Sequence, residues 1–170
     1  YGWGDSPING HGGSAGVSAA IVPGLPSGDL VKEIKGDHTD ACIVLESGGQ
    51  YCFGDNSSGE FGDTTTTSST TPVISSVDDV YEAYHGGDVH CVIRGSAKEV
   101  FCVGAGANSA LGTGSNLDSS SYTSTGLTDV RRLTILGNAN TQNVCALKND
   151  GTVWCWGLNT TNILETSSNI

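Results

Sequence analysis

The sequence predicts an all-β fold that is built from a repeat of about 50 residues. Its six cysteines form three pairs, and the first members of these pairs, Cys42, Cys91 and Cys145, recur at nearly that interval. Within each interval, short segments rich in β-forming residues alternate with Gly-rich turns, which indicates about four strands per repeat. A period of this size is typical of propellers and of solenoids. The spacing alone leaves both architectures open.

The segment after the second cysteine of each pair recurs most clearly. An aromatic or apolar residue is followed by glycine and then by a polar loop, and the chain opens on the same pattern. The four segments are Trp3-Gly4-Asp5-Ser6, Phe53-Gly54-Asp55-Asn56, Val103-Gly104-Ala105-Gly106 and Trp156-Gly157-Leu158-Asn159. This alignment predicts a single repeat domain over residues 1–170. Its repeats are 1–50, which is expected to start in the middle of a blade, 51–100 and 101–153, followed by a partial repeat at 154–170.

Each repeat is expected to supply its strands in a fixed order. A Val-led strand comes first, within residues 29–34, 79–83 and 129–133. A hairpin that carries the two cysteines follows it, and a long polar loop then leads to a last short strand. Candidates for this last strand lie near residues 20–22, 72–74 and 122–123.

The hairpin register predicts which cysteines lie opposite each other. Asn149-Asp150-Gly151 is typical of a three-residue turn with glycine at the left-handed position, and it places Cys145 opposite Cys155. The same rule predicts the pairs Cys42–Cys52 and Cys91–Cys102, with a turn that is one residue longer in the middle hairpin. Opposite residues of antiparallel strands are close enough for a disulfide. We therefore expect three disulfides, and three pairs of buried, reduced thiols are the alternative.

Composition and charge limit the compartment and the partners. Three disulfides imply an oxidising setting, so the protein is expected to be extracellular or at the cell surface. With 7 basic against 18 acidic residues the net charge is −11, which argues against nucleic acid as a partner. No apolar stretch of about 20 residues is present, so membrane insertion is not expected. The chain lacks Met, so we expect a signal peptide or a larger region before Tyr1.

Three features together resemble the regulator of chromosome condensation repeat. They are Gly36-Asp37-His38-Thr39 before a cysteine strand, the cysteine hairpin, and Cys155-Trp156-Gly157-Leu158-Asn159 after it. The resemblance covers nearly the whole chain, and Gly12 and Asn108 mark where the loop motif departs from it. It implies a β-propeller of four-stranded antiparallel blades rather than a solenoid. The paired cysteines are similar to those of secreted relatives of this family.

The resemblance implies a binding scaffold and not an enzyme. The best-known activity of the family is nucleotide exchange on a small nuclear GTPase together with chromatin docking, and no residue here can be carried over to either role. The sequence has no Gly-x-Ser-x-Gly, His-Glu-x-x-His or phosphate-binding Gly-x-x-x-x-Gly-Lys motif. We expect no catalytic residue and no cofactor. Active residues in blades outside this sequence are the alternative.

No metal site is expected either. The cysteines lack the short Cys-x2-Cys spacing of zinc sites. The four histidines, at positions 11, 38, 85 and 90, fall at different places in the repeat, so each is interpreted as a surface or turn residue. Two N-glycosylation sequons begin at Asn56 and Asn159. Both asparagines occupy the repeat's own Asn position, so a structural role in the turn is equally open.

Three full repeats and a partial one cannot close a propeller of about four to eight blades. We therefore expect an incomplete ring, which is either a piece of a longer propeller or a subunit that associates with other copies in an oligomer or filament. The first functional hypothesis is a secreted, non-enzymatic module with a structural, adhesive or self-assembling role. The second is a regulatory propeller that binds another extracellular protein or a glycan on one rim.

Overall fold

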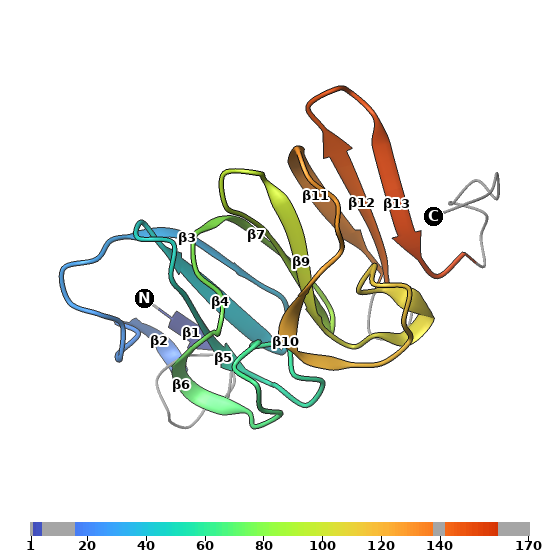
Figure 1. Cartoon of the computed structure of the whole chain (residues 1–170). Coiled ribbons are helices and arrows are strands. Elements are labelled where there is room, and N and C mark those ends of the chain that lie inside the picture. The colour runs from blue at the N-terminus through green and yellow to red at the C-terminus, as the bar shows by residue number, and fades with distance from the viewer. Residues whose placement is uncertain (1, 5–15, 138–141, 160–170) are drawn as a thin grey trace.

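The computed structural model describes residues 2–4, 16–137 and 142–159, which form antiparallel β-sheets and one short 3-10 turn (Figure 1). Blade 1 comprises β3 (Val31–Gly36), β4 (Asp40–Leu45), β5 (Gln50–Gly54) and β6 (Ser69–Ile74), hydrogen-bonded in that order. Each strand follows its neighbour in the sequence, so every connection is a hairpin or a loop between adjacent strands. This arrangement confirms the predicted four-stranded antiparallel blade.

Blade 2 repeats the plan with β7 (Val80–Gly86), β8 (Val89–Arg94), β9 (Glu99–Gly104) and β10 (Ser119–Ser124). The 3-10 turn η1 (Ala107–Ser109) lies in the loop between β9 and β10. Blade 3 consists of β11 (Val130–Leu136), β12 (Asn143–Lys148) and β13 (Val153–Gly157) within the described residues. The predicted repeats at 51, 101 and 154 therefore begin inside sheets and not between them.

A two-stranded sheet precedes blade 1. It pairs β1 (Gly2–Gly4) with β2 (Gly16–Ala20), and Gly4 lies opposite Gly16. Gly54 lies opposite Ser69 at the matching place of blade 1. This pair therefore corresponds to the two outer strands of a further blade, and the described residues form an open, incomplete propeller.

The blades stack face to face, with the first strand of each blade nearest to the first strand of the next. β7 contacts both β3 and β11, and Figure 1 shows these three strands side by side. Apolar clusters fill the space between the blades, because side chains alternate between the two faces of each sheet. The core of the protein therefore consists of interfaces between blades.

The repeated glycine after the second cysteine has a structural cause. Gly54, Gly104 and Gly157 all have a positive φ, at 119°, 106° and 109°. A Cβ atom on Gly104 would lie 2.0 Å from the carbonyl oxygen of Asp88, and the other two positions are equally crowded by backbone. Only glycine fits where the third strand of a blade passes the start of the second.

The cysteines lie opposite each other in the hairpin of each blade. The structure joins Cys42 to Cys52, Cys91 to Cys102 and Cys145 to Cys155 as disulfides, each with a Cα separation of 4.1 Å. In the middle hairpin Arg94 pairs with Glu99, so the longer turn keeps the cysteines in register. None of the described residues forms a helix long and apolar enough to cross a membrane.

Candidate functional site

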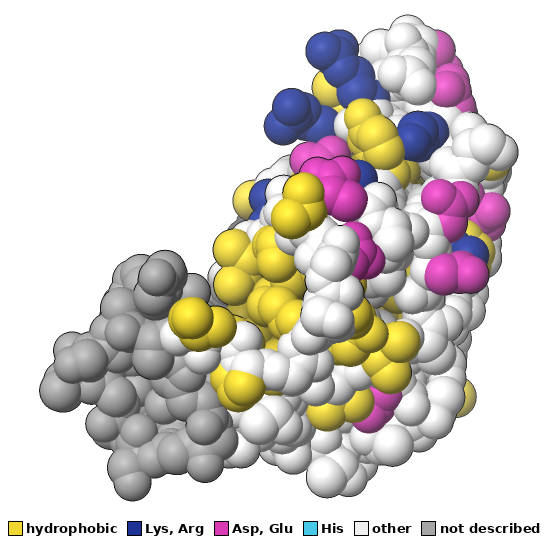
Figure 2. Space-filling view, turned by 90° about the vertical axis from the view of Figure 1, so that its left-hand side faces the viewer, with side chains coloured by type: hydrophobic (Ala, Val, Ile, Leu, Met, Phe, Trp, Pro, Cys, Tyr) yellow, Lys and Arg dark blue, Asp and Glu magenta, His cyan; other side chains and the backbone are white. Residues whose placement is uncertain are grey.

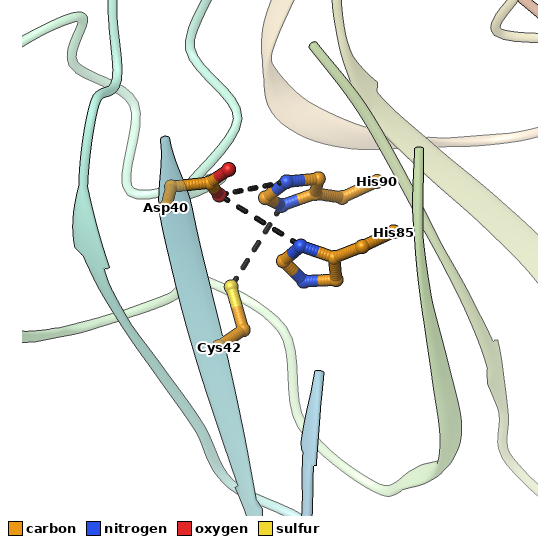
Figure 3. Close-up of side chains that lie close together, drawn as sticks. All are labelled: Asp40, Cys42, His85 and His90. Atoms are coloured by element: carbon orange, nitrogen blue, oxygen red, sulfur yellow. Dashed lines mark hydrogen bonds and ion pairs between the residues drawn. The ribbon is translucent and has the colours of Figure 1, made fainter. Parts of the chain in front are cut away.

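Three ionisable side chains meet between blades 1 and 2 (Figure 3). Asp40 is the first residue of β4, and its side chain points toward blade 2. His85 and His90 lie directly opposite each other on β7 and β8, so their rings stand next to each other at one end of that hairpin. The turn that joins the two strands, Gly87-Asp88, is short enough to bring both rings to the same place.

The three side chains are almost completely buried. Nε2 of His90 lies 2.8 Å from Oδ2 of Asp40, and Nδ1 of His85 lies 3.8 Å from the same oxygen. The two imidazole rings have centroids 3.5 Å apart and are tilted by 33°. Only 4% of the His85 side chain is exposed, and the other two are still more deeply buried. A charged group at this depth requires a partner, because burial without one is costly.

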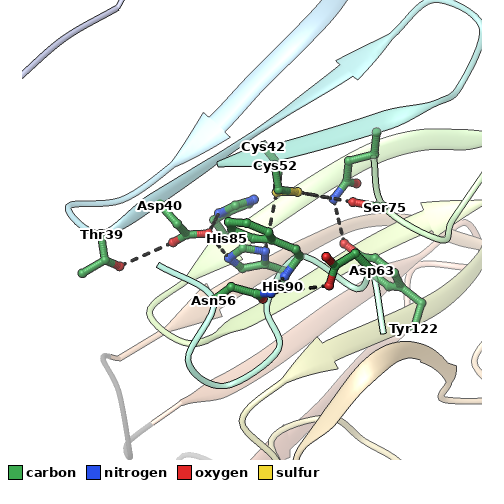
Figure 4. Close-up of a disulfide and its surroundings, with 12 residues drawn as sticks. Thr39, Asp40, Cys42, Cys52, Asn56, Asp63, Ser75, His85, His90 and Tyr122 are labelled. Atoms are coloured by element: carbon green, nitrogen blue, oxygen red, sulfur yellow. Dashed lines mark hydrogen bonds and ion pairs between the residues drawn. A yellow bond between two sulfur atoms is a disulfide. The ribbon is translucent and has the colours of Figure 1, made fainter. Parts of the chain in front are cut away.

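The first disulfide borders this cluster and continues the polar network across the interface (Figure 4). Sγ of Cys42 lies 3.7 Å from Nδ1 of His90. On the other side, Nε2 of Gln50 lies 3.2 Å from Sγ of Cys52 and donates a hydrogen bond of 2.8 Å to the hydroxyl of Tyr122 in blade 2. The disulfide of blade 1 therefore lies among polar groups that link two blades.

Burial and charge set the protonation of the two histidines in opposite directions. Burial, together with the neighbouring His90 and Lys35, holds the pKa of His85 well below its usual value, so this imidazole is neutral. Burial also disfavours a charge on His90, but the adjacent carboxylate of Asp40 outweighs it and raises the pKa of His90. Burial raises the pKa of Glu60, and the charges of His90 and Asp40 also act on this carboxyl group. The cluster thus combines a neutral imidazole, His85, with a second imidazole, His90, whose protonated form the Asp40 carboxylate stabilises.

The sequence interpretation of these histidines was wrong. His85 and His90 are core residues between blades, because the hairpin turn and the stacking of blade 2 on blade 1 direct both rings inward. His38 is exposed as expected, with 86% of its side chain accessible, and His11 lies outside the described residues. The expectation that no metal-ligating set is present also missed this cluster. The available signal was two histidines on either side of a Gly-Gly-Asp turn.

The predicted glycosylation residues lie in different surroundings. Asn56 is fully buried, its Oδ1 accepts a hydrogen bond from the backbone N–H of Phe61, and its Nδ2 donates to the carbonyl oxygens of Thr65 and Thr67. A glycan on this nitrogen would require the loop to open, so the geometry favours the structural role. Asn159 is partly exposed at the end of the described residues, and its glycosylation stays a prediction.

The matching positions of the next interface are apolar. Register alignment of the hairpins places Val89 where blade 1 has Asp40, and Ile135 and Val144 where blade 2 has His85 and His90. These residues belong to, or pack against, the apolar cluster between blades 2 and 3. The polar cluster is therefore a property of one interface and not of the repeat.

Comparisons with known proteins agree with this architecture. A profile of the regulator of chromosome condensation (RCC1) repeat matches residues 138–162. Human WBSCR16 is 26% identical in sequence, with a TM-score of 0.75 over 93% of this chain, and this chain spans 42% of that protein. No curated protein matches the sequence significantly.

Two structures of yeast RCC1 (Prp20) have the same fold. The complex with Kap60 is 21% identical, with a TM-score of 0.61 over 78% of this chain and 30% of the yeast chain. Prp20p from Saccharomyces cerevisiae, described with its binding properties to Gsp1p and histones, is also 21% identical. Its TM-score is 0.62 over 78% of this chain and 32% of its own. Repeat profile, blade topology and likeness to these structures lead to one conclusion: the chain contains an RCC1 repeat and has the fold of the RCC1 β-propellers.

Proposed function

We propose that the chain is a non-catalytic scaffold that binds other β-sheets of its own repeat type through its two open blade faces. The propeller completed in this way binds protein partners. Three disulfides support a role in an oxidising compartment, at the cell surface or outside the cell. The observation that carries the proposal is the exposure of residues whose repeat equivalents are buried.

The β3 part of the face of blade 1 that points away from blade 2 carries this signature, whereas Ile43, Leu45 and Phe53 on the same face are buried. Val31 and Ile34 in β3 are 51% and 59% exposed. Val80 and Ala83 occupy the same register positions in blade 2 and are buried against blade 1. Figure 2 views this side of the molecule and shows apolar side chains gathered at its centre. An exposed apolar surface of this kind is typical of a protein interface.

The far face of blade 3 carries the same signature. Val153 is 64% exposed, whereas Val100, at the same position relative to the blade 2 disulfide, is fully buried against blade 3. Leu147 is only partly buried, and its equivalent Ile93 is fully buried. Both faces therefore have the composition of a blade interface. A sheet of the same repeat type matches them in shape and in apolar character.

The relatives support this role. The chain spans less than half of human WBSCR16, which supports a need for further blades. Yeast RCC1 was solved in complex with Kap60, and Prp20p is described with binding to Gsp1p and histones, so propellers of this fold bind proteins. The net charge of −11 disfavours a direct nucleic acid contact for this chain.

The proposal is tested by sedimentation velocity of the purified chain, with a second copy as the source of matching sheets. We expect association that weakens at least about tenfold in the double variant Val31→Lys/Ile34→Lys, because two cations would be buried in the contact. Leu117→Lys is the control, since Leu117 lies on a loop and is also exposed. A 17.4 kDa monomer at every concentration would contradict the proposal.

Electron microscopy of any assembly distinguishes a closed ring from a filament. Contacts between unlike faces close into a ring when the rotation permits it, and they extend into a filament when it does not. Rings support completion of the propeller by a second copy. Filaments support the structural or adhesive role.

A further inference from the structure

We propose that Asp40, His85 and His90 form a binding site for one zinc ion between blades 1 and 2. Two imidazoles and a carboxylate are the ligand types that zinc uses in proteins. The inference rests on this cluster alone and does not depend on the association of the open blade faces. It assigns a role to the buried polar groups that the propeller fold by itself does not explain.

The first support is an unpartnered, buried side chain. Neither Nδ1 nor Nε2 of His85 makes a hydrogen bond with any described residue, although the side chain is 4% exposed. Nε2 of His90 and Oδ2 of Asp40 are at ion-pair distance but are not aligned as a hydrogen bond. Buried polar groups are rarely left without partners. A cation among these atoms would give His85 the partner that it lacks.

The second support is the distance between the ligand atoms. Zinc takes nitrogen and oxygen ligands at about 2.0 to 2.2 Å, and tetrahedral angles then place neighbouring ligand atoms about 3.3 to 3.5 Å apart. The measured separations from Oδ2 of Asp40, 2.8 Å to His90 and 3.8 Å to His85, lie on either side of this range. Small rotations of the side chains bring all three atoms to one ion.

The surroundings select the type of metal. Calcium and magnesium prefer six or more oxygen ligands, whereas imidazole nitrogens favour zinc and similar transition metals. Cys42 is also within 4.8 Å of the other ligand atoms, but its sulfur belongs to the disulfide and is not a thiolate ligand. Three protein ligands leave the fourth position to a water molecule or to an outside ligand.

The charge around the site suits the entry of a cation. Two further carboxyl groups lie near the cluster: Asp37 in the turn between β3 and β4, and Asp88 in the turn between β7 and β8. The backbone of His85 is partly exposed next to the hairpin turn, so the site lies just below the surface. An ion held here would connect β4 of blade 1 to β7 and β8 of blade 2.

The direct test is a calorimetric titration of the oxidised full chain with zinc chloride after treatment with EDTA. We expect one zinc ion per chain. The variant His85→Ile carries the residue that blade 3 has at this position. It removes a direct ligand, so it should weaken binding by more than the roughly 10- to 100-fold that loss of an outer-shell partner costs. His38→Ala is the matched control, because His38 is exposed and lies outside the cluster. Binding that survives His85→Ile, or that falls equally in His38→Ala, overturns the proposal.

A second measurement needs no variant and decides the question if His85→Ile does not fold. Nitrogen-15 NMR of the imidazole rings should show two of the four histidines shifting when zinc is added to the unaltered chain. Cobalt(II) in place of zinc should give the visible absorption bands of a tetrahedral site. Unchanged rings, or shifts confined to His11 and His38, overturn the proposal.

Discussion

The two interfaces between the blades differ in chemistry although they share one backbone plan. Between blades 1 and 2, the positions nearest the hairpin ends hold Asp40, His85 and His90, and Glu60 is buried in the adjoining loop. Between blades 2 and 3, the equivalent positions hold Val89, Ile135, Val144 and Ala110. The first set brings two carboxyl groups and two imidazoles into the interior, and the second brings only hydrocarbon.

This difference shows that blade interfaces vary independently. In repeat proteins each unit contacts only its neighbours, so stability is close to a sum of unit and interface contributions. The apolar interface stabilises by burial of apolar surface. The polar interface includes a buried ion pair, whose desolvation opposes its Coulomb attraction. The proposed binding of zinc therefore explains the polar interface better than a gain in stability does.

The largest expected effect comes from removal of one member of the ion pair. In EDTA, Asp40→Ala should lower the free energy of unfolding by about 3 to 5 kcal/mol, because it leaves His90 buried without its carboxylate. Val89→Ala, the matched change in the apolar interface, should cost about 2 kcal/mol through a small cavity. Urea unfolding measures both. Equal losses would show that the two interfaces do not differ in the way described.

The disulfides between blades should differ from the disulfide on the far face of blade 3 in their contribution to stability and in their rate of reduction. Cys42, Cys52, Cys91 and Cys102 are fully buried between blades, whereas Cys145 and Cys155 are partly exposed on the far face of blade 3. Each disulfide closes a loop of similar length, so removal of any pair should cost about 2 to 4 kcal/mol, with the buried pairs at the upper end. During mild reduction, alkylation and mass spectrometry should find Cys145 and Cys155 labelled first. Simultaneous labelling of all six would contradict this order.

The loops after β5 and β9 should show a smaller difference, in how much one asparagine of each loop contributes to the free energy of unfolding. Asn56→Ala removes the acceptor for the N–H of Phe61 and should cost about 1 to 3 kcal/mol, because that donor is buried. The loop of blade 2 has Gly106 at this position and uses the exposed Asn116 to accept from the N–H of Ser109. Asn116→Ala should therefore cost about 0.5 kcal/mol or less. Urea unfolding of both variants and hydrogen exchange of the Phe61 N–H test this prediction. A larger loss of stability in Asn116→Ala than in Asn56→Ala would contradict it.

The sequence predicted the repeat frame and the blade because their determinants are local. Turn residues fix the hairpin register, the register places each cysteine opposite its partner, and the recurring glycine meets a backbone contact that recurs in every blade. The histidine cluster has no such local determinant. It joins residues 40, 85 and 90 from two blades at positions that are apolar in the next interface, so repeat periodicity pointed away from it. Only the packing of blade 2 on blade 1 brings these side chains together.

The central claim is that the same arrangement of blades accommodates either a metal-binding or an apolar interface. A single variant tests this claim. Asp40→Val/Glu60→Ala/His85→Ile/His90→Val gives the first interface the residues of the second. Calorimetry and urea unfolding in EDTA should find that zinc binding is lost while stability is unchanged or about 1 to 4 kcal/mol higher, because well-packed hydrocarbon replaces a buried ion pair. Retained zinc binding, or a chain several kcal/mol less stable than the parent, would contradict the claim.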